Sequence, residues 1–485
     1  MKAGGKPCLS CFLRAFFLCL AVFGLLAVSA RAEDSHTPLE PIECPGSRLS
    51  GEQAVCFILH VPADWNDIAH RSLQLPVMRF APLGPKATKP PLLVLAGGPG
   101  QSVIRLEKSI SRNLKFLRKD RELILMDQRG TGPLAGDIAC AEAIRKGEEI
   151  DMEAAVKCVK RSEEAGRLLS DYRTAFAVED YRALRYALKI ETWAVIANSY
   201  GARVAQGLIG RDEKGIDRVI FNGPLFAATR LFDWKPDEQI DKVIELCDAQ
   251  DKCRSDFPNL YWDYQRLGFD MRKARVADEE ATPPAALPFL YQTRLNAFLA
   301  RHKAKQVPAD ITRTVQSLDK ALAEDSIWTP PPPLPQPMKG IGLLMHLAIS
   351  CAEDVHPLAD QALYEMAQPM TLLFYRDACE QIENATANTI RPDMVSGKAA
   401  KSNLPILVLN GELDTIVNPE AMASTLPLYS NAIRIEMPYA GHDVLSKLSC
   451  ARSIAAQFLD GAKADALDRG CLRSGDLAFS SLAQK

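Results

Sequence analysis

The sequence has no excess charge of either sign. It carries 58 lysines and arginines against 60 aspartates and glutamates, which gives a formal net charge of −2 over 485 residues. Because nucleic-acid binding relies on clustered positive charge, this balance predicts no nucleic-acid partner. The 47% hydrophobic and 24% charged contents are typical of a globular protein with a large core or with two domains.

Motifs that hold metals or dinucleotides are also missing. The sequence has no H-E-x-x-H, and the cysteines beyond residue 32 form no C-x-x-C. The glycine-rich stretch Ala96-Gly-Gly-Pro-Gly100 lacks the G-x-G-x-x-G spacing, and Pro99 has no N–H to offer a phosphate. We therefore predict neither a metal ion nor a cofactor.

The N-terminal apolar run is too short to span a membrane comfortably. It covers residues 16–28, whereas a spanning helix needs about 20 apolar residues. Basic residues precede it, and Ala30-Arg-Ala32 follows it with the A-x-A pattern of a cleavage site. We predict a signal peptide over residues 1–32, export to the periplasm or the medium, and no stable membrane span after processing. An uncleaved anchor is the alternative.

The number of cysteines agrees with export. Three of the 13 lie in the N-terminal segment, and the other ten are even in number, as expected in an oxidising compartment. Spacing does not determine connectivity, so pairing of sequence neighbours is a hypothesis. The pairs would be Cys44/Cys56, Cys140/Cys158, Cys247/Cys253, Cys351/Cys379 and Cys450/Cys471.

Short apolar runs separated by helical patterns predict an α/β fold. Two runs should form a lead-in hairpin that turns at residues 62–65, and the later ones a mostly parallel, doubly wound sheet. Residues 225–400 interrupt the alternation, and we predict a largely helical cap domain there. The core would consist of residues 33–224 and 401–485. The expected strands are residues 56–61, 73–80, 91–95, 123–126, 193–197, 218–222, 405–409 and 432–437.

A serine lies where the apolar run 193–197 gives way to a helical pattern. The sequence Ala197-Asn-Ser-Tyr-Gly201 approximates G-x-S-x-G, the motif of a nucleophile on a sharp strand-to-helix bend. Small residues are needed around the serine because the two backbones nearly touch. Ser199 is therefore the predicted nucleophile. The alternative is a Ser-Gly pair that merely ends a strand.

Two further side chains complete a candidate triad. Asp414 and His442 each follow a predicted strand, and the chain order Ser, Asp, His is that of the hydrolases with this bend. Glu412 and Asp443 are rival carboxylates. Gly98, in the glycine-rich loop, is the preferred donor to a developing oxyanion, with Gly97 second.

Taken together, these motifs resemble the proline iminopeptidase and tripeptidyl aminopeptidase family of α/β-hydrolases. The resemblance spans nearly the whole mature chain, and the cysteine placement resembles exported members with a tripeptidyl-aminopeptidase-like C-terminal segment. Ala96 stands where the family often has His, and Ala197 and Asn198 stand where it usually has glycines. The matching stretches are Gly97-Gly-Pro-Gly100, Asp127-Gln-Arg-Gly-Thr-Gly132, Ser199-Tyr-Gly201, Gly411-Glu-Leu-Asp414 and Gly441-His442.

The resemblance implies an exported serine aminopeptidase that acts on peptides with a free N-terminus. Ser199 would attack the carbonyl, His442 would act as base and then acid, and Asp414 would fix the His442 tautomer. The N–H groups of Gly98 and Tyr200 would hold the oxyanion.

Recognition of the substrate amine is a separate question. Glu353 and Asp354, beside Cys351, are the candidate anchors for the amine. Alternatively, they form a solvated acidic turn or pair with Arg129, which with Asp127 is expected to brace the loop around the nucleophile. An esterase acting on small non-peptide esters and a non-catalytic binding protein remain alternative functions.

Overall fold

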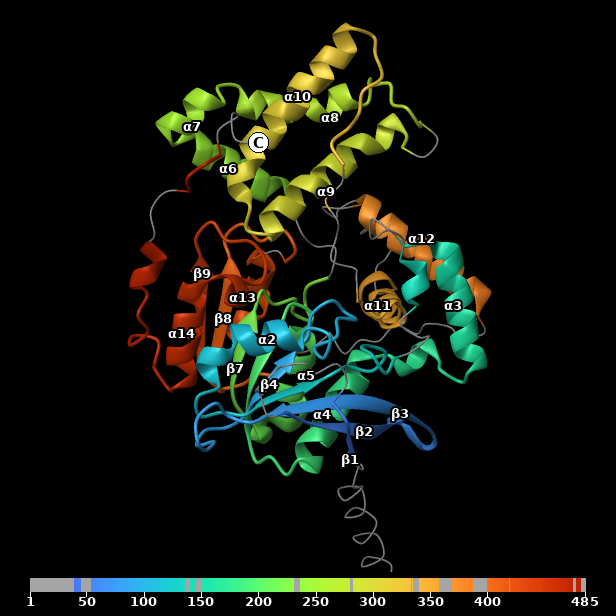
Figure 1. Ribbon diagram of the computed structural model, residues 1–485, viewed down its shortest axis with the longest axis vertical. Helices are drawn as coiled ribbons and strands as arrows, with labels where there is room; N and C mark the ends of the chain where they lie inside the picture. The colour runs from blue at the N-terminus through green and yellow to red at the C-terminus, as the bar shows by residue number, and fades with distance from the viewer. Residues whose placement is uncertain are drawn as a thin grey trace, which may run out of the picture. The chain divides into compact units, whose positions relative to one another are not determined.

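Figure 1 shows the computed structural model of the chain. The structure describes residues 39–44, 54–135, 140–144, 150–230, 236–279, 282–332, 334, 340–356, 369–386, 399–417, 419–473 and 477–480. The predicted signal peptide, residues 1–32, lies outside the described residues.

Within the described residues, nine strands form one sheet in the order β1-β2-β3-β5-β4-β6-β7-β8-β9. The first three strands are antiparallel, and those from β5 to β9 across the sheet are parallel. This confirms the predicted mostly parallel sheet. The bounds are β1 (Leu39–Ile42), β2 (Ala54–Asp64), β3 (Asp67–Phe80), β4 (Leu92–Leu95), β5 (Leu123–Met126), β6 (Trp193–Asn198), β7 (Ile216–Asn222), β8 (Ile406–Gly411) and β9 (Ala432–Met437).

The hairpin turn differs from the expected position. Pro62 still pairs with Ser72 and, beyond an irregularity, Asp64 pairs with Asp67, so the chain turns at residues 65–66 and not over residues 62–65. A proline can occupy such a strand position when its missing N–H is not needed for the ladder.

The central strands are buried on both faces, as a doubly wound sheet requires. Every residue of β4 and β5 is buried. One face packs against α4 (Thr174–Ala187) and α5 (Gly201–Asp212), and the other against α2 (Glu107–Asn113), α13 (Val444–Lys447) and α14 (Ser449–Leu459).

Residues between β7 and β8 contribute two groups of helices (Figure 1). The first has its own apolar cluster, which also includes Leu413 from the loop after β8. The second packs against α3 (Met152–Glu164) and joins the core on the α5 face of the sheet. The first group is α6 (Pro236–Asp248), α7 (Asp251–Asp256), α8 (Leu260–Met271), α9 (Leu287–Ala300) and α10 (Val307–Ala323); the second is α11 (Leu343–Ile349), the π-helical turn η8 (Ser350–Val355) and α12 (Pro369–Ala385).

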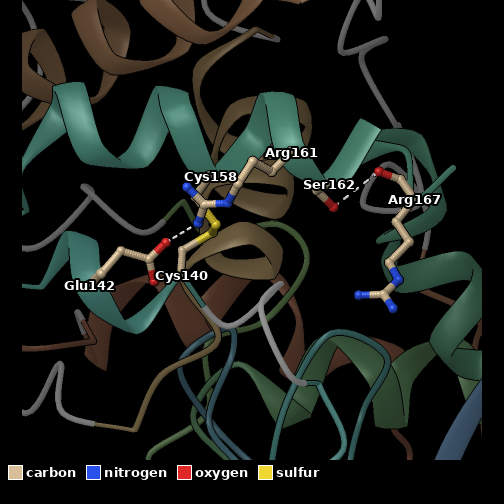
Figure 2. The surroundings of a disulfide bond; sticks show 6 residues. All are labelled: Cys140, Glu142, Cys158, Arg161, Ser162 and Arg167. Atoms are coloured by element: carbon tan, nitrogen blue, oxygen red, sulfur yellow. Dashed lines mark hydrogen bonds and ion pairs between the residues drawn. A yellow bond between two sulfur atoms is a disulfide. The ribbon is translucent and has the colours of Figure 1, made fainter. Parts of the chain in front are cut away.

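All five hypothesised cysteine pairs form disulfides. Figure 2 shows one of them, Cys140–Cys158, which ties the segment before α3 to that helix beside the Glu142–Arg161 ion pair. A second, Cys351–Cys379, joins η8 to α12. None of the helices in the described ranges is long and apolar enough to cross a membrane.

Candidate active site

Ser199 occupies a sharp bend between β6 and α5. Its φ is +49°, a left-handed conformation that is rare outside glycine and is found at strained functional turns. A Cβ on Gly201 would lie 2.7 Å from the carbonyl oxygen of Ala96, so only glycine fits there. These two features are those of the predicted nucleophile bend.

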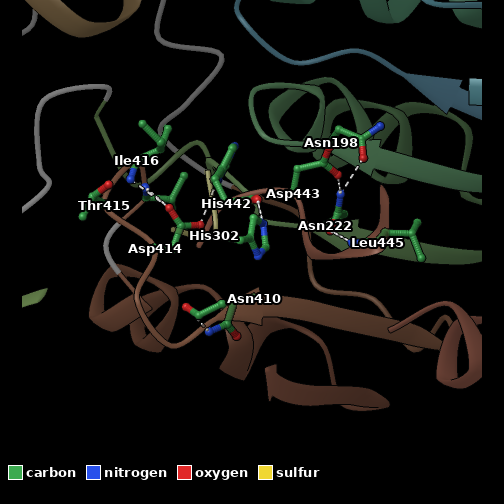
Figure 3. A network of polar contacts seen from close by, with 12 residues as sticks. Asn198, Asn222, His302, Asn410, Asp414, Thr415, Ile416, His442, Asp443 and Leu445 are labelled. Atoms are coloured by element: carbon green, nitrogen blue, oxygen red, sulfur yellow. Dashed lines mark hydrogen bonds and ion pairs between the residues drawn. The ribbon is translucent and has the colours of Figure 1, made fainter. Parts of the chain in front are cut away.

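The unusual residue before the serine is part of a hydrogen-bond network (Figure 3). The Asn198 amide donates to the Leu95 carbonyl at 3.2 Å and accepts from the Asn222 amide at 2.8 Å. Asn222 also donates to Asp443 at 2.7 Å. The side chain at position 198 therefore links β6 to the end of β4 and, through Asn222, to the residue after His442.

Asp414 and His442 meet beyond the ends of β8 and β9, where Figure 3 shows them. His442 Nδ1 lies 2.8 Å from Asp414 Oδ2. The other carboxylate oxygen accepts the backbone N–H groups of Ile416 at 2.8 Å and Val417 at 3.1 Å. Asp414 is fully buried, and these three hydrogen bonds satisfy both of its carboxylate oxygens. The orientation of the carboxylate is therefore fixed.

The rival carboxylates have other partners. Glu412 pairs with Lys242 at 2.8 Å and accepts the Tyr439 N–H at 2.9 Å. Asp443 accepts from Asn222 and from the Ser446 hydroxyl. Of the three acidic residues in the two loops, Asp414 is the one that binds the His442 ring.

Ser199 and the His442 ring both approach the end of β7. The Ser199 N–H donates to the Asn222 carbonyl at 3.0 Å. At the next residue, Gly223, an added Cβ would lie 2.9 Å from His442 Cε1 and Nδ1. In the part of the chain that the structure describes, no hydrogen bond joins the Ser199 hydroxyl to the ring. Such bonds often tighten only when substrate is present.

The predicted oxyanion donors flank the serine. A Cβ on Gly97 would lie 3.0 Å from Ser199 Cβ, so the glycine-rich loop packs directly on Ser199. Gly97 N–H faces the Gln101 side-chain oxygen at 3.4 Å. Among the hydrogen bonds of the described residues, none uses the N–H of Gly98 or of Tyr200. Both groups remain available to a developing negative charge.

Asp127 and Arg129 have different structural tasks. The Asp127 carboxylate accepts from the Ser102 hydroxyl at 2.8 Å and from Ile104 N–H at 3.0 Å, which braces the segment after the glycine-rich loop. Burial raises the pKa of Asp127 to about 6. Arg129 pairs with Asp180, at 2.7 Å, and not with the acidic pair of η8.

Glu353 and Asp354 are neither a solvated turn nor partners of Arg129. Their exposed fractions are 4% and 0%, and both bind Arg203, at 3.2 Å and 2.7 Å. Arg203 lies on α5, about one turn after Ser199. An amine anchor needs a carboxylate that faces the substrate, whereas these two serve as internal counter-ions.

Sequence reasoning missed a contact from the helical insertion. His302, just after α9, places Nε2 2.5 Å from the backbone carbonyl oxygen of His442 (Figure 3). Burial lowers the pKa of His302, which favours the neutral ring with Nε2–H as donor. Nothing in one sequence distinguishes this histidine from a surface residue. Arg203 could have been found from the sequence, because an arginine on the apolar face of a predicted helix indicates a buried ion pair.

The ionisation of His442 gives a prediction for the pH dependence of activity. Burial lowers its pKa, but the Asp414 carboxylate more than offsets this, so the net shift is upward from 6.5. A general base must be neutral, so activity is lost as pH falls through the raised pKa. We expect the acidic limb of kcat/KM to have its midpoint above pH 6.5. A flat profile, or a midpoint below 6.5, would contradict this assignment.

Comparisons with known proteins bear on the fold. The sequence profile of the α/β-hydrolase fold matches residues 90–446 and confirms the predicted fold class. Similar solved structures include a serine hydrolase from the polyaromatic-hydrocarbon-degrading bacterium Cycloclasticus zankles, with 12% identity, 84% of this chain and 98% of that chain covered, and a TM-score of 0.37. A proline iminopeptidase from Mycobacterium smegmatis has 16% identity, coverage of 83% and 97%, and a TM-score of 0.38.

An epoxide hydrolase is similar at the same level, with 11% identity, coverage of 80% and 95%, and a TM-score of 0.36. Likeness at these identities and TM-scores assigns no activity or substrate. A search of curated protein sequences found no match. Across the described residues, no group of three or more His, Cys, Asp or Glu could hold a metal ion.

Proposed function

Because the chain belongs to the α/β-hydrolase fold family, we propose that it is an exported serine hydrolase that works through Ser199, His442 and Asp414. The observation that carries this proposal is the 2.8 Å contact between His442 Nδ1 and Asp414. The His442 ring lies against Gly223, the residue after Asn222, whose carbonyl accepts the Ser199 N–H. The five disulfides support export, since such bonds persist in oxidising compartments.

The reaction proceeds in two halves. Ser199 Oγ attacks the substrate carbonyl while His442 Nε2 takes the hydroxyl proton, and the Gly98 and Tyr200 N–H groups hold the oxyanion. His442 then gives the proton to the leaving group, which leaves an acyl-enzyme. Water then attacks this ester with His442 again as the base. The carboxylic acid is released, and the Ser199 hydroxyl is regenerated. Asp414 stays ionised and holds the Nδ1–H tautomer.

The finer proposal is an aminopeptidase that removes one to three N-terminal residues, of the prolyl or the di- or tripeptidyl type. The glycine-rich loop, the serine bend and the two C-terminal motifs support it by their resemblance to that family. Because Glu353 and Asp354 are buried and both bind Arg203, the substrate amine is expected to be held elsewhere. The same observation favours an esterase for small esters without an amine as the second candidate.

A substrate panel separates the two candidates. The aminopeptidase is expected to cleave peptides with a free N-terminus at least about tenfold faster than their N-acetylated forms, because the acetyl group removes the charge that the site recognises. The measurement is kcat/KM for matched peptide pairs and for short-chain p-nitrophenyl esters. Equal rates on both peptide forms, or turnover of esters alone, would contradict the aminopeptidase and leave the esterase.

A further inference from the structure

The glycine-rich loop is held by a buried histidine from the second helix group of the insertion. His346, on α11, is 5% exposed and has its Nδ1 3.1 Å from the Pro99 carbonyl oxygen. Its Nε2 lies 2.7 Å from the Tyr375 hydroxyl on α12. A carbonyl can only accept, so Nδ1 carries the proton, and Nε2 of the neutral ring accepts from Tyr375.

The start of α11 holds the next peptide groups as well. The Gly342 N–H donates to the Gly100 carbonyl at 2.8 Å, and Gln101 forms an isolated bridge with Ile341. A Cβ on Gly100 would lie 2.8 Å from the Gly342 carbonyl, so the two segments are in close contact. Three consecutive residues after Gly98 are therefore fixed by residues 341–346.

The loop has little means of fixing itself. Residue 96, just after β4 ends, is an alanine that is 3% exposed and offers no polar side chain. Within the loop, the Gln101 N–H reaches the Gly97 carbonyl at 3.3 Å, and the Gln101 side chain reaches Gly97 N–H at 3.4 Å. Both contacts are long for N–H···O bonds. The hydrogen bond from His346 to the Pro99 carbonyl thus holds the loop in place where its own hydrogen bonds are weak.

We propose that His346 is a positioning residue for the oxyanion hole, acting through the Pro99 carbonyl, and that Tyr375 fixes its tautomer. The inference rests on the proposed serine hydrolase. Gly98 N–H belongs to the Gly97–Gly98 peptide group, and a single peptide group, Gly98–Pro99, separates it from the carbonyl that His346 holds. Movement of the Pro99 carbonyl therefore displaces that donor. Losing one oxyanion donor costs about 10²- to 10³-fold in kcat. Burial lowers the pKa of His346, in keeping with a neutral ring.

The test uses a fluorophosphonate, because its reaction with a serine nucleophile needs no knowledge of the natural substrate. The variants are His346→Leu, which removes both ring contacts, His346→Asn, whose amide can still donate near the Nδ1 position, and Tyr375→Phe. The measured quantities are kinact and KI, with thermal unfolding as the check that each variant is folded.

We expect His346→Leu to lower kinact about 10²-fold with KI changed less than threefold. His346→Asn should recover most of the loss, and Tyr375→Phe should lose about three- to tenfold because Nε2 no longer has its donor. If His346→Leu does not fold, the comparison of His346→Asn with Tyr375→Phe still decides the question.

Two results would overturn the inference. One is a kinact within threefold of the wild type in both His346→Leu and Tyr375→Phe. The other is a rise in KI with kinact unchanged, which would indicate a role in binding. Failure of the wild-type protein to react at all would contradict the proposed function instead, so the two failures are distinguishable.

Discussion

Replacing Asp414 by asparagine is expected to lower kcat about 10⁴-fold while the protein remains folded, as in other Ser-His-Asp triads. Asp414 Oδ2 accepts from His442 Nδ1, and Oδ1 accepts two backbone N–H groups. An amide can keep those two bonds only by turning its NH₂ toward the imidazole. The ring would then present its Nδ1 lone pair and carry the proton on Nε2, where a base must accept.

The matched control is Glu412→Gln, the rival carboxylate two residues earlier. Glu412 binds Lys242 and the Tyr439 N–H rather than the imidazole. We expect its kcat to stay within about threefold of the wild type, because a surface-accessible ion pair contributes little. Steady-state kinetics on both variants, with circular dichroism as the folding control, give the comparison. A larger loss in Glu412→Gln than in Asp414→Asn would contradict the assigned triad.

The second large effect concerns stability. Arg203→Leu should destabilise the fold by about 3–5 kcal/mol, because it leaves two buried carboxylates without their cation. The Arg203 side chain is 2% exposed and also donates to the Thr229 carbonyl at 2.7 Å. Glu353 in turn accepts the Thr174 N–H, and the Thr174 hydroxyl meets the Tyr200 hydroxyl at 2.7 Å. The structural disturbance in this variant should therefore extend to Tyr200, the residue after Ser199.

Arg211→Ala, two turns further along α5, is the matched control. Arg211 is 64% exposed and pairs with Glu179 at the surface, so its removal should cost under about 1 kcal/mol. Urea unfolding of the oxidised protein measures both variants. Similar free energies of unfolding for Arg203→Leu and the wild type would contradict an essential buried ion pair.

Local sequence patterns were sufficient to predict the strands of the sheet and the order of the candidate site residues along the chain. Each expected strand is present. Runs of four or more apolar residues, such as 123–126 and 193–197, have few alternatives to a buried strand, and residues 432–437 alternate apolar and polar side chains as a half-buried strand does. The bend at Ser199 was predictable from the small residues around it. The hairpin turn was misplaced because proline usually ends a strand, whereas Pro62 lies within one.

Contacts between distant segments could not be predicted in this way. Arg203 and Asp354 are 151 residues apart in the sequence. The spacing of apolar residues does not indicate which buried charged residues form ion pairs. The same holds for His302 and His346, which act on backbone carbonyls rather than on a recognisable motif. Apolar periodicity identified helices in residues 225–400, but did not indicate that α11 and α12 pack on the core while α6 to α10 form a cluster of their own.

Covalent labelling of the folded protein tests the central claim most directly. A fluorophosphonate probe, followed by peptide mass spectrometry, should modify Ser199 in the wild type, leave Ser199→Ala unlabelled and react far more slowly with His442→Ala. Label on another residue, or undiminished labelling of Ser199→Ala, would contradict the account.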